Sequence, residues 1–144
     1  MDRLLVKRLR EDAVLPARAT SGSAGYDLCS VEEIRLAPGE RRLVPTGIAV
    51  AIGDAHVVGL VYARSGIALK HGIAPINCVG VIDSDYRGEL MVPLTNHGSE
   101  SYRIGKGDRI AQLVFTPVYL PKLEETDQLD ETGRGCGGFG STAK

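Results

Sequence analysis

Apolar and polar residues alternate in short runs along most of the chain. Val, Ile, Leu and Tyr dominate these runs, and Gly, Pro, Asn and Asp separate them. Residues of the first group fit pleated strands, whereas those of the second group form turns. The spacing predicts an all-β fold, a jelly-roll-like β-sandwich or barrel. We expect strands at residues 4–9, 31–36, 42–44, 48–52, 56–62, 78–82, 89–94, 102–104 and 109–120.

One segment favours a helix instead of a strand. Residues 65–71 are followed by Gly72. Glycine commonly comes just after the last helical residue, because it adopts the left-handed conformation there without strain. We therefore expect a single short helix at 65–71.

Composition narrows the class of protein. A chain of 144 residues is one domain that can bury roughly two-thirds of its unfolded surface. The net charge of −1 gives no basic field for nucleic acid or an anionic membrane, and no apolar run approaches the roughly 18 residues of a membrane span. Cys29, Cys78 and Cys136 are odd in number and widely spaced, which disfavours a disulfide framework or a zinc site. We expect a cytoplasmic protein that binds neither nucleic acid nor a membrane.

The C-terminal part differs from the rest of the chain. Residues 121–131 are mostly polar and acidic, as in a tether that runs along a surface, and residues 132–144 are rich in glycine. We divide the chain into a β-rich part at residues 1–120 and a tether with a terminal flap at residues 121–144, both within the same domain.

The glycine-rich end carries chemistry in addition to its flexibility. Arg134, Phe139, Ser141 and Thr142 supply a guanidinium, an aromatic ring and two hydroxyls within a few residues. Glycines let backbone N–H groups approach an anion closely, while they contribute nothing to a core. The segment indicates a flexible flap that orders on a nucleotide. The alternative is a disordered tail of the kind common at chain ends.

Residues 80–90 contain the highest density of potentially functional side chains in the chain. An apolar run ends at Asp83, a turn follows, and a second apolar run begins, which predicts a β-hairpin. At the border of an apolar strand, partial desolvation suits the Asp83 carboxylate to act as a general base. Asp is also an ordinary turn residue, so Asp83 alone does not decide between the two roles. Asn77 carries the amide donors and acceptor that complement a pyrimidine edge, and it could equally stabilise a turn.

Three other segments carry groups that suit an anion or a metal. Arg64, Ser65 and Gly66 combine a forked cation, a hydroxyl and an open backbone, which suit phosphate oxygens. Gln112 lies within a predicted strand, where it faces away from its two apolar neighbours. Asp27 places a second carboxylate close to glycine. Each signal is weak by itself, because surface residues of these types are usually only solvated.

The order of these segments resembles that of the trimeric deoxyuridine triphosphate nucleotidohydrolases (dUTPases). The five motifs of that family match residues 24–28, 63–66, 80–90, 107–114 and 134–142, so that the resemblance covers nearly the whole chain. Two positions depart from the family pattern. Ala63 stands where proline is usual, and Cys136 stands where serine is common.

The resemblance implies a homotrimer with shared active sites, which hydrolyses dUTP to dUMP and pyrophosphate. Water attacks the α-phosphate after activation by Asp83. The resemblance further implies Mg²⁺ as the cofactor, held by the substrate phosphates without a direct protein ligand, with Asp27 expected to support its hydration shell through water. As in that family, each site is expected to take the segment 80–90 from one subunit, the Arg64 and Gln112 segments from a second, and the flap from a third.

The resemblance also assigns residues to the parts of the substrate. Asn77 and the backbone around Val81, Ile82 and Met91 bind the uracil edge, and Tyr86 packs on the deoxyribose. The phosphate-binding groups are Arg64, Ser65, Gly66 and Gln112. In the flap, Gly138 and Phe139 close over the base, while Arg134, Ser141 and Thr142 reach the phosphates.

Two alternative functions remain open from the sequence. The related dCTP deaminases share the fold and some motifs, but they act on cytosine and need a different acid–base carboxylate. A catalytically silent nucleotide-binding module could use the same scaffold. The complete flap and the Asp83-x-x-Tyr86 arrangement favour hydrolysis over both alternatives.

Overall fold

The computed structural model describes residues 3–138, and strands make up nearly all of its regular structure. No helix in this part of the chain has the length and apolar character needed to cross a membrane. In chain order, the elements are β1 (Leu5–Arg8), β2 (Tyr26–Cys29), β3 (Ile34–Leu36), β4 (Arg41–Ala51), β5 (Val57–Tyr62), α1 (Ser65–His71), β6 (Ile73–Pro75), β7 (Gly80–Ile82), β8 (Glu89–Asn96), β9 (Tyr102–Ile104) and β10 (Arg109–Pro117).

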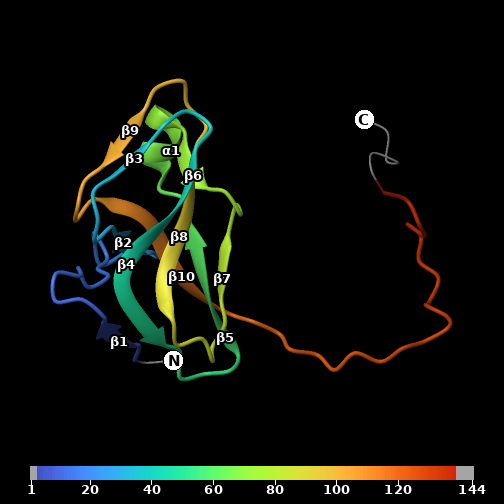
Figure 1. The fold of residues 1–144 in the computed structure, drawn as a ribbon. Coiled ribbons are helices and arrows are strands. Elements are labelled where there is room, and N and C mark those ends of the chain that lie inside the picture. Colours follow the sequence, from blue (N-terminus) through green and yellow to red (C-terminus); the bar gives the residue numbers. More distant parts are fainter. Residues whose placement is uncertain (1–2, 139–144) are drawn as a thin grey trace.

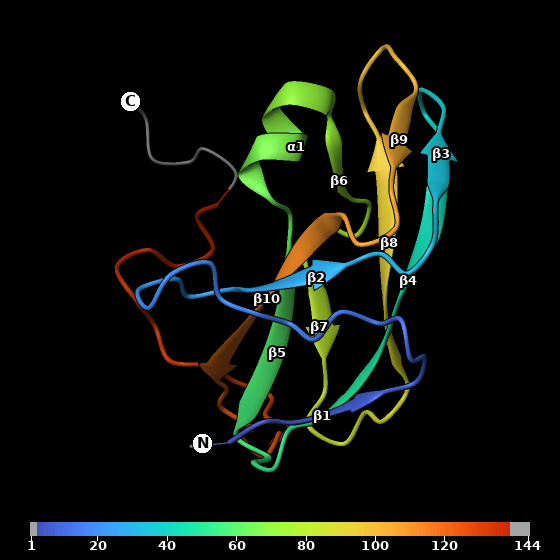
Figure 2. The same cartoon turned by 90° about the vertical axis from the view of Figure 1, so that its left-hand side faces the viewer.

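The strands form two four-stranded sheets and one two-stranded sheet. The first large sheet has the order β1-β4-β8-β6 and the second has the order β2-β10-β5-β7, with every neighbouring pair antiparallel. The pair β3-β9 extends from one end of the molecule, next to α1 (Figure 1; Figure 2). This arrangement confirms the predicted all-β, jelly-roll-like sandwich.

The core lies between the two large sheets. Side chains alternate along each strand, so every second residue points inward. Val44 and Val92 face each other across β4 and β8, and both are almost fully buried. Val61 and Leu113 form the corresponding pair across β5 and β10. The residues that alternate with them along each strand point to the outer faces of the sheets, where they can contact a ligand.

The predicted helix is confirmed at Ser65–His71. Gly72 follows it with φ 69°, in the left-handed region, and its N–H donates to the carbonyls of Ile67 and Ala68. The backbone of Gly98 lies so close that a Cβ on Gly72 would come within 2.6 Å of its nitrogen. The glycine therefore both ends the helix and lets two backbone segments meet.

The structure differs from the prediction at several strands. A turn was expected between residues 42–44 and 48–52, but β4 continues through them with a register shift between Pro45 and Ala49. Gly47 takes φ 68° at this irregularity, and its N–H donates to the Glu89 carboxylate at 2.7 Å. The residues that indicated a turn thus form a bulge within one strand. β2 and β6 were not predicted: β2 follows a loop rich in glycine and serine, and β6 directly follows the glycine that ends the helix.

The prediction of a hairpin at residues 80–90 was wrong. β7 pairs with β5 in one sheet, whereas β8 pairs with β4 and β6 in the other. Strand partners are set by long-range contacts, so the turn residues between two apolar runs do not by themselves make the runs pair with each other. Residues 83–88 therefore cross from one sheet to the other.

The C-terminal part leaves the sandwich after β10. The N–H of Val118 donates to the carbonyl of His56 at 2.8 Å, and beyond this bond the chain extends away from the body (Figure 1). Tyr119 and Leu123 are 95% and 96% exposed. Residues 121–131 therefore do not run along the surface of their own sandwich, in contrast to the expectation from the sequence.

Candidate active site

Two arginines hold the carboxylate of Asp27 on β2. Arg64 Nε donates to Oδ1 at 3.0 Å, and Arg109 Nη1 donates to Oδ2 at 3.1 Å. Asp27 lies at the strand position opposite Gln112, and its side chain is only 18% exposed. Charge-assisted hydrogen bonds of this kind are stronger than neutral ones. They hold two cations close together on the outer face of the sheet.

Gln112 is fixed beside this group. Its Nε2 donates to the carbonyl of Ala63 at 2.9 Å, directly before Arg64. On the other side, a Cβ on Gly25 would lie 2.5 Å from Gln112 Oε1, so only glycine leaves room for this amide. The expected orientation is confirmed, because Gln112 lies half-buried on the outer face, while Ala111 and Leu113 are fully buried.

These groups line a hollow that we call the Asp27 hollow. Its volume is about 310 Å³, at the low end of the range for ligand pockets. Open space surrounds Gly66, so a ligand can approach the backbone there. Guanidiniums, a hydroxyl and exposed backbone suit phosphate oxygens. The lining residues are Ala19, Ser23, Ala24, Gly25, Asp27, Arg64, Ser65, Gly66, Arg109 and Gln112.

A second hollow, the Asn77 hollow, opens where β7 parts from β8. Its volume is about 330 Å³, and most of its wall is apolar. Gly80 lets the wall approach closely, since a Cβ there would lie 3.1 Å from Val61. Apolar walls with one amide and free backbone groups suit a flat polar ring. The lining residues are Leu43, Val61, Pro75, Asn77, Gly80, Val81, Ile82, Tyr86, Glu89, Met91 and Pro93.

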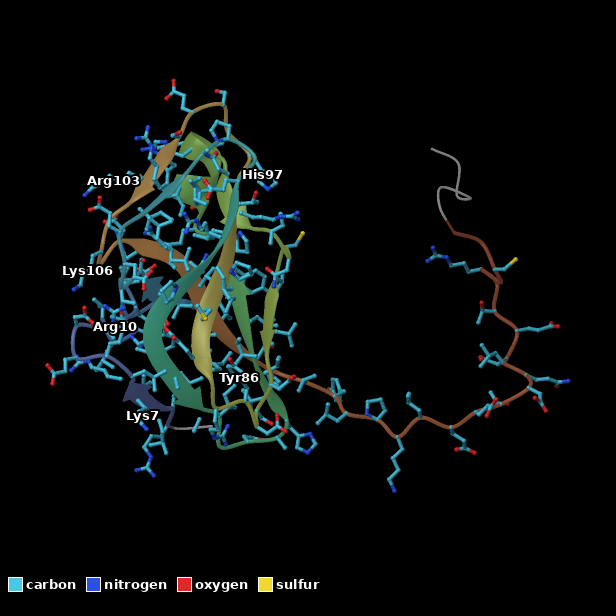
Figure 3. All side chains as sticks on the ribbon, in the orientation of Figure 1. Lys7, Arg10, Tyr86, His97, Arg103 and Lys106 are labelled. Carbon is cyan, nitrogen blue, oxygen red and sulfur yellow. The ribbon has the colours of Figure 1, made fainter. Side chains whose placement is uncertain are left out.

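Tyr86 is held at the rim of the Asn77 hollow, on the connection between β7 and β8 (Figure 3). Its hydroxyl donates to the carbonyl of Glu89 at 3.0 Å. A Cβ on Gly88 would lie 2.4 Å from the Tyr86 hydroxyl oxygen, so the ring occupies the space that any larger residue would fill. Glycine at position 88 is thus a condition for this placement of Tyr86.

The two hollows do not meet within one chain. Asp27 and Gln112 face outward on β2 and β10, whereas Val61, next to Gly80, faces the core. Three strand spacings of about 4.8 Å separate β2 from β7, which amounts to about 14 Å between their backbones. Asp83 lines neither hollow and is exposed, so the partial burial expected for it is not present in the single chain.

The flap residues lie far along the extended C-terminal part. Arg134 is exposed, and its Nε donates to the carbonyl of Gly137 at 2.8 Å. Gly138 is the last described residue. Phe139, Ser141 and Thr142 lie outside the described residues.

The comparison with known proteins identifies the family. The dUTPase family model matches residues 11–143. The chain belongs to the dUTPase family. A deoxyuridine 5'-triphosphate nucleotidohydrolase of Desulfitobacterium hafniense is 54% identical over 130 residues, which cover 89% of this chain and 86% of that protein. This membership confirms dUTP hydrolysis and favours it over the deaminase and the silent module.

Solved dUTPase structures have the same fold. The dUTPase of Staphylococcus bacteriophage 80α with dUpNHpp has a TM-score of 0.91 and 32% identity, with 100% of both chains covered. A mutant dUTPase from phage phi11 of S. aureus has a TM-score of 0.81 and 30% identity, covering 88% of this chain and 98% of that one. The phi11 structure reveals the coordination of a structural Mg(II) ion in that protein.

The donor groups of this dUTPase fit a metal held mainly by its substrate. Within residues 3–138, no three His, Cys, Asp or Glu side chains gather into a ligand cluster. Among these described residues, Asp27 is the only carboxylate that lines the Asp27 hollow. Mg²⁺ commonly keeps several waters and binds one or two carboxylates together with substrate phosphates. The hollow matches this type of coordination.

Two features of this dUTPase site escaped the sequence analysis. Arg109 lay within a matched segment, but an arginine at a strand start carries no signal of its own. Leu43 lines the Asn77 hollow from β4, and its exposed apolar side chain is apparent only in the structure.

Cys29 lies on β2, two residues after Asp27, and is buried. Its burial, and to a lesser degree the charge of Asp27, raises the pKa of the Cys29 thiol. This thiol is therefore a packing group.

Proposed function

We propose that this dUTPase works as a homotrimer whose active sites combine the Asn77 hollow of one chain with the Asp27 hollow of another. The separation of the two hollows carries this proposal. A single dUTP molecule must contact a base site and a phosphate site at once, and in one chain these open on different sides of a sheet. Juxtaposing two chains brings the two halves together without any change of fold.

The uracil and deoxyribose occupy the Asn77 hollow. The amide of Asn77 and the backbone around Val81, Ile82 and Met91 bind the polar edge of the base. Tyr86 fills the space next to C2′, so that a 2′-hydroxyl has no room. The apolar wall supports this assignment, because a flat ring gains from burial there while its edge is hydrogen-bonded.

The triphosphate occupies the Asp27 hollow. Arg64, Ser65, the open backbone at Gly66 and Gln112 bind its oxygens. When bound, Mg²⁺ neutralises charge on the phosphates, and Asp27 supports its hydration shell through water. Phosphoryl transfer needs alignment and charge neutralisation more than covalent chemistry from the protein. The fixed guanidiniums and amide of the hollow support both needs.

Asp83 activates the attacking water. The water oxygen forms a bond to the α-phosphorus, and one water proton passes to the Asp83 carboxylate. The bond from the α-phosphorus to the bridging oxygen breaks, and that oxygen leaves with pyrophosphate while dUMP remains. Asp83 follows β7 directly, next to the residues that bind the base, so it lies on the nucleoside side of the reacting phosphate.

The C-terminal part of a third chain closes the site. Residues beyond Val118 leave their own sandwich, and an extended chain of eleven residues reaches about 36 Å. In the flap, Gly138 and Phe139 cover the base, and Arg134, Ser141 and Thr142 reach the phosphates. Closure excludes bulk water from the reacting phosphate.

The free thiols of Cys29, Cys78 and Cys136 support a reducing, cytoplasmic location.

A mixing experiment tests the shared site. One variant carries Asp83→Asn, and the other ends before Arg134, so neither chain has both a general base and a flap. If base and flap come from different chains, random assortment in co-refolded trimers restores roughly a quarter of the sites, because two independent choices must both be right. Mixed trimers, verified by mass, that show no activity above the parent variants would show that Asp83 and the flap serve the same site from the same chain.

A further inference from the structure

The guanidinium of Arg64 is held on two sides in the free chain. Its Nε donates to Asp27 Oδ1 at 3.0 Å, and its Nη1 donates to the backbone carbonyl of Arg109 at 3.2 Å. A guanidinium has five N–H donors in a rigid fork. Both donors of Nη2 and one donor of Nη1 therefore remain for a ligand in the Asp27 hollow.

Arg109 provides two of the three contacts that maintain this arrangement. Its Nη1 donates to Asp27 Oδ2 at 3.1 Å, while its own carbonyl accepts from Arg64. The register between β10 and β2 shifts between Arg109 and Ala111. Irregularities of this kind commonly redirect a side chain beside a functional site. Here the irregularity coincides with the residue that reaches Asp27.

The exposures distinguish the roles of the two arginines. The side chain of Arg64 is 24% exposed and that of Arg109 is 52% exposed, around an Asp27 that is 18% exposed. One carboxylate between two guanidiniums leaves the group with a formal surplus of one positive charge. Both arginines line the Asp27 hollow, and Arg109 is the more exposed of the two.

We propose that Arg109 is a positioning residue for phosphate binding, which acts through Asp27 and Arg64. This inference rests on the proposed role of the Asp27 hollow as the triphosphate site. An arginine that is ordered before binding does not lose its rotamer freedom when phosphate arrives, and its donors already have the productive geometry. Without the Arg109 side chain, the carboxylate of Asp27 loses its second partner and can rotate, so its bond to Arg64 no longer has a fixed direction, although the backbone carbonyl of residue 109 still accepts from Arg64.

A double-mutant cycle in the full-length protein tests the proposal. The variants are Arg109→Ala, Arg64→Ala and the double variant, with kcat and KM measured for dUTP and Kd for deoxyuridine and dUpNHpp. Arg109→Ala should lower kcat/KM by roughly 10- to 100-fold, as expected for a misplaced binding group. It should weaken dUpNHpp binding and leave deoxyuridine binding unchanged. In the Arg64→Ala background, the same substitution should change kcat/KM by no more than about twofold.

Arg109→Lys supplies the conservative variant. A lysine keeps the charge and can donate to Asp27, so it should recover part of the lost activity. It also completes the cycle if Arg109→Ala does not fold. Arg103→Ala is the matched control, because Arg103 is an exposed strand arginine paired with Glu33, away from both hollows. It should retain wild-type kinetics.

The outcomes separate this inference from the proposed function. Losses that multiply in the double variant would mean that Arg109 acts independently of Arg64, and would overturn the positioning role. An Arg109→Ala variant with unchanged kinetics would overturn it as well. If Arg64→Ala itself has no effect, the phosphate site is wrong and the positioning role is refuted with it. Equal weakening of deoxyuridine and dUpNHpp binding would indicate a general structural role instead.

Discussion

Replacing Gly88 with alanine should change which sugar the enzyme accepts while its folding stability stays nearly constant. The new Cβ would lie 2.4 Å from the Tyr86 hydroxyl oxygen and 2.6 Å from Cζ, so the ring has to move. The backbone of Gly88 does not have a positive φ and accepts alanine without strain. The perturbation therefore acts on Tyr86 and leaves the chain path unchanged.

Opposing terms make the change in stability small. Moving the ring breaks the hydrogen bond from Tyr86 to the Glu89 carbonyl, a contribution of about 0.5–1.5 kcal/mol. Tyr86 is 44% exposed, so water can replace part of that bond. Alanine in place of glycine reduces the conformational entropy of the unfolded chain, which stabilises the fold by about 0.4–1 kcal/mol. The two effects nearly cancel.

The change in specificity is larger. A pocket that excludes one small group discriminates by about 1–3 kcal/mol, or about 10- to 200-fold. If Tyr86 excludes the 2′-hydroxyl, its displacement should reduce the preference for dUTP over UTP by at least about tenfold. Tyr86→Ala should reduce it at least as much, since it removes the ring altogether.

The assay compares kcat/KM for dUTP and UTP in the wild type, Gly88→Ala and Gly53→Ala, with thermal unfolding measured in parallel. Gly53 is the matched control, because its Cβ would meet nothing within 4 Å. It should keep the wild-type ratio. A ratio unchanged in both Gly88→Ala and Tyr86→Ala would refute the reasoning and leave Tyr86 as a packing residue.

Three further predictions concern the base, the flap and the surface charges. Asp83→Asn should lower kcat by roughly 10²- to 10⁴-fold and leave dUpNHpp binding largely intact; a loss below about tenfold at unchanged fold would require a different base. Truncation before Arg134 should lower kcat far more than the melting temperature, because Arg134 is exposed and bonds only locally in the described chain; equal losses in both would contradict the flap model. A hydrogen bond from Lys106, and secondly one from Arg10, lowers the pKa of Asp12 from 3.8 to about 2. The ion pairs of Asp12 therefore stabilise the fold above about pH 4 and lose this effect as the pH falls toward 2. The melting-temperature difference between wild type and Asp12→Asn should therefore shrink between about pH 5 and about pH 2, and a constant difference would show that these ion pairs do not contribute.

Local patterns in the sequence predicted most of the secondary structure. The β-rich class and the helix at Ser65–His71 depend on neighbouring residues: periodicity, turn formers and the glycine after the helix. The same local reasoning failed at Pro45, Thr46 and Gly47, because a turn signal and a bulge within a long strand have the same composition. Which of the two forms depends on the partner strand β8.

The chemical inventory of the site was also readable from the sequence. Asp27, Arg64, Asn77, Gln112 and Asp83 stood out because the types of their side chains and the glycines near them suit a nucleotide. The structure confirms the outward position of Gln112, and it adds a close contact between Gln112 and Gly25 that the sequence did not predict. It does not bring the five residues together, since they occupy two hollows and an exposed connection.

The sequence by itself determined the fold class, the helix, the family and the set of reactive side chains, because these depend on residue type and short spacing. Only the tertiary structure decided that β7 pairs with β5, that the two hollows open on different sides of a sheet, and that Arg109 supports Asp27. Arg109 and Asp27 lie 82 positions apart, and no local pattern relates them. Long-range strand pairing brings them into contact, so their shared role emerges only once the sheet has formed.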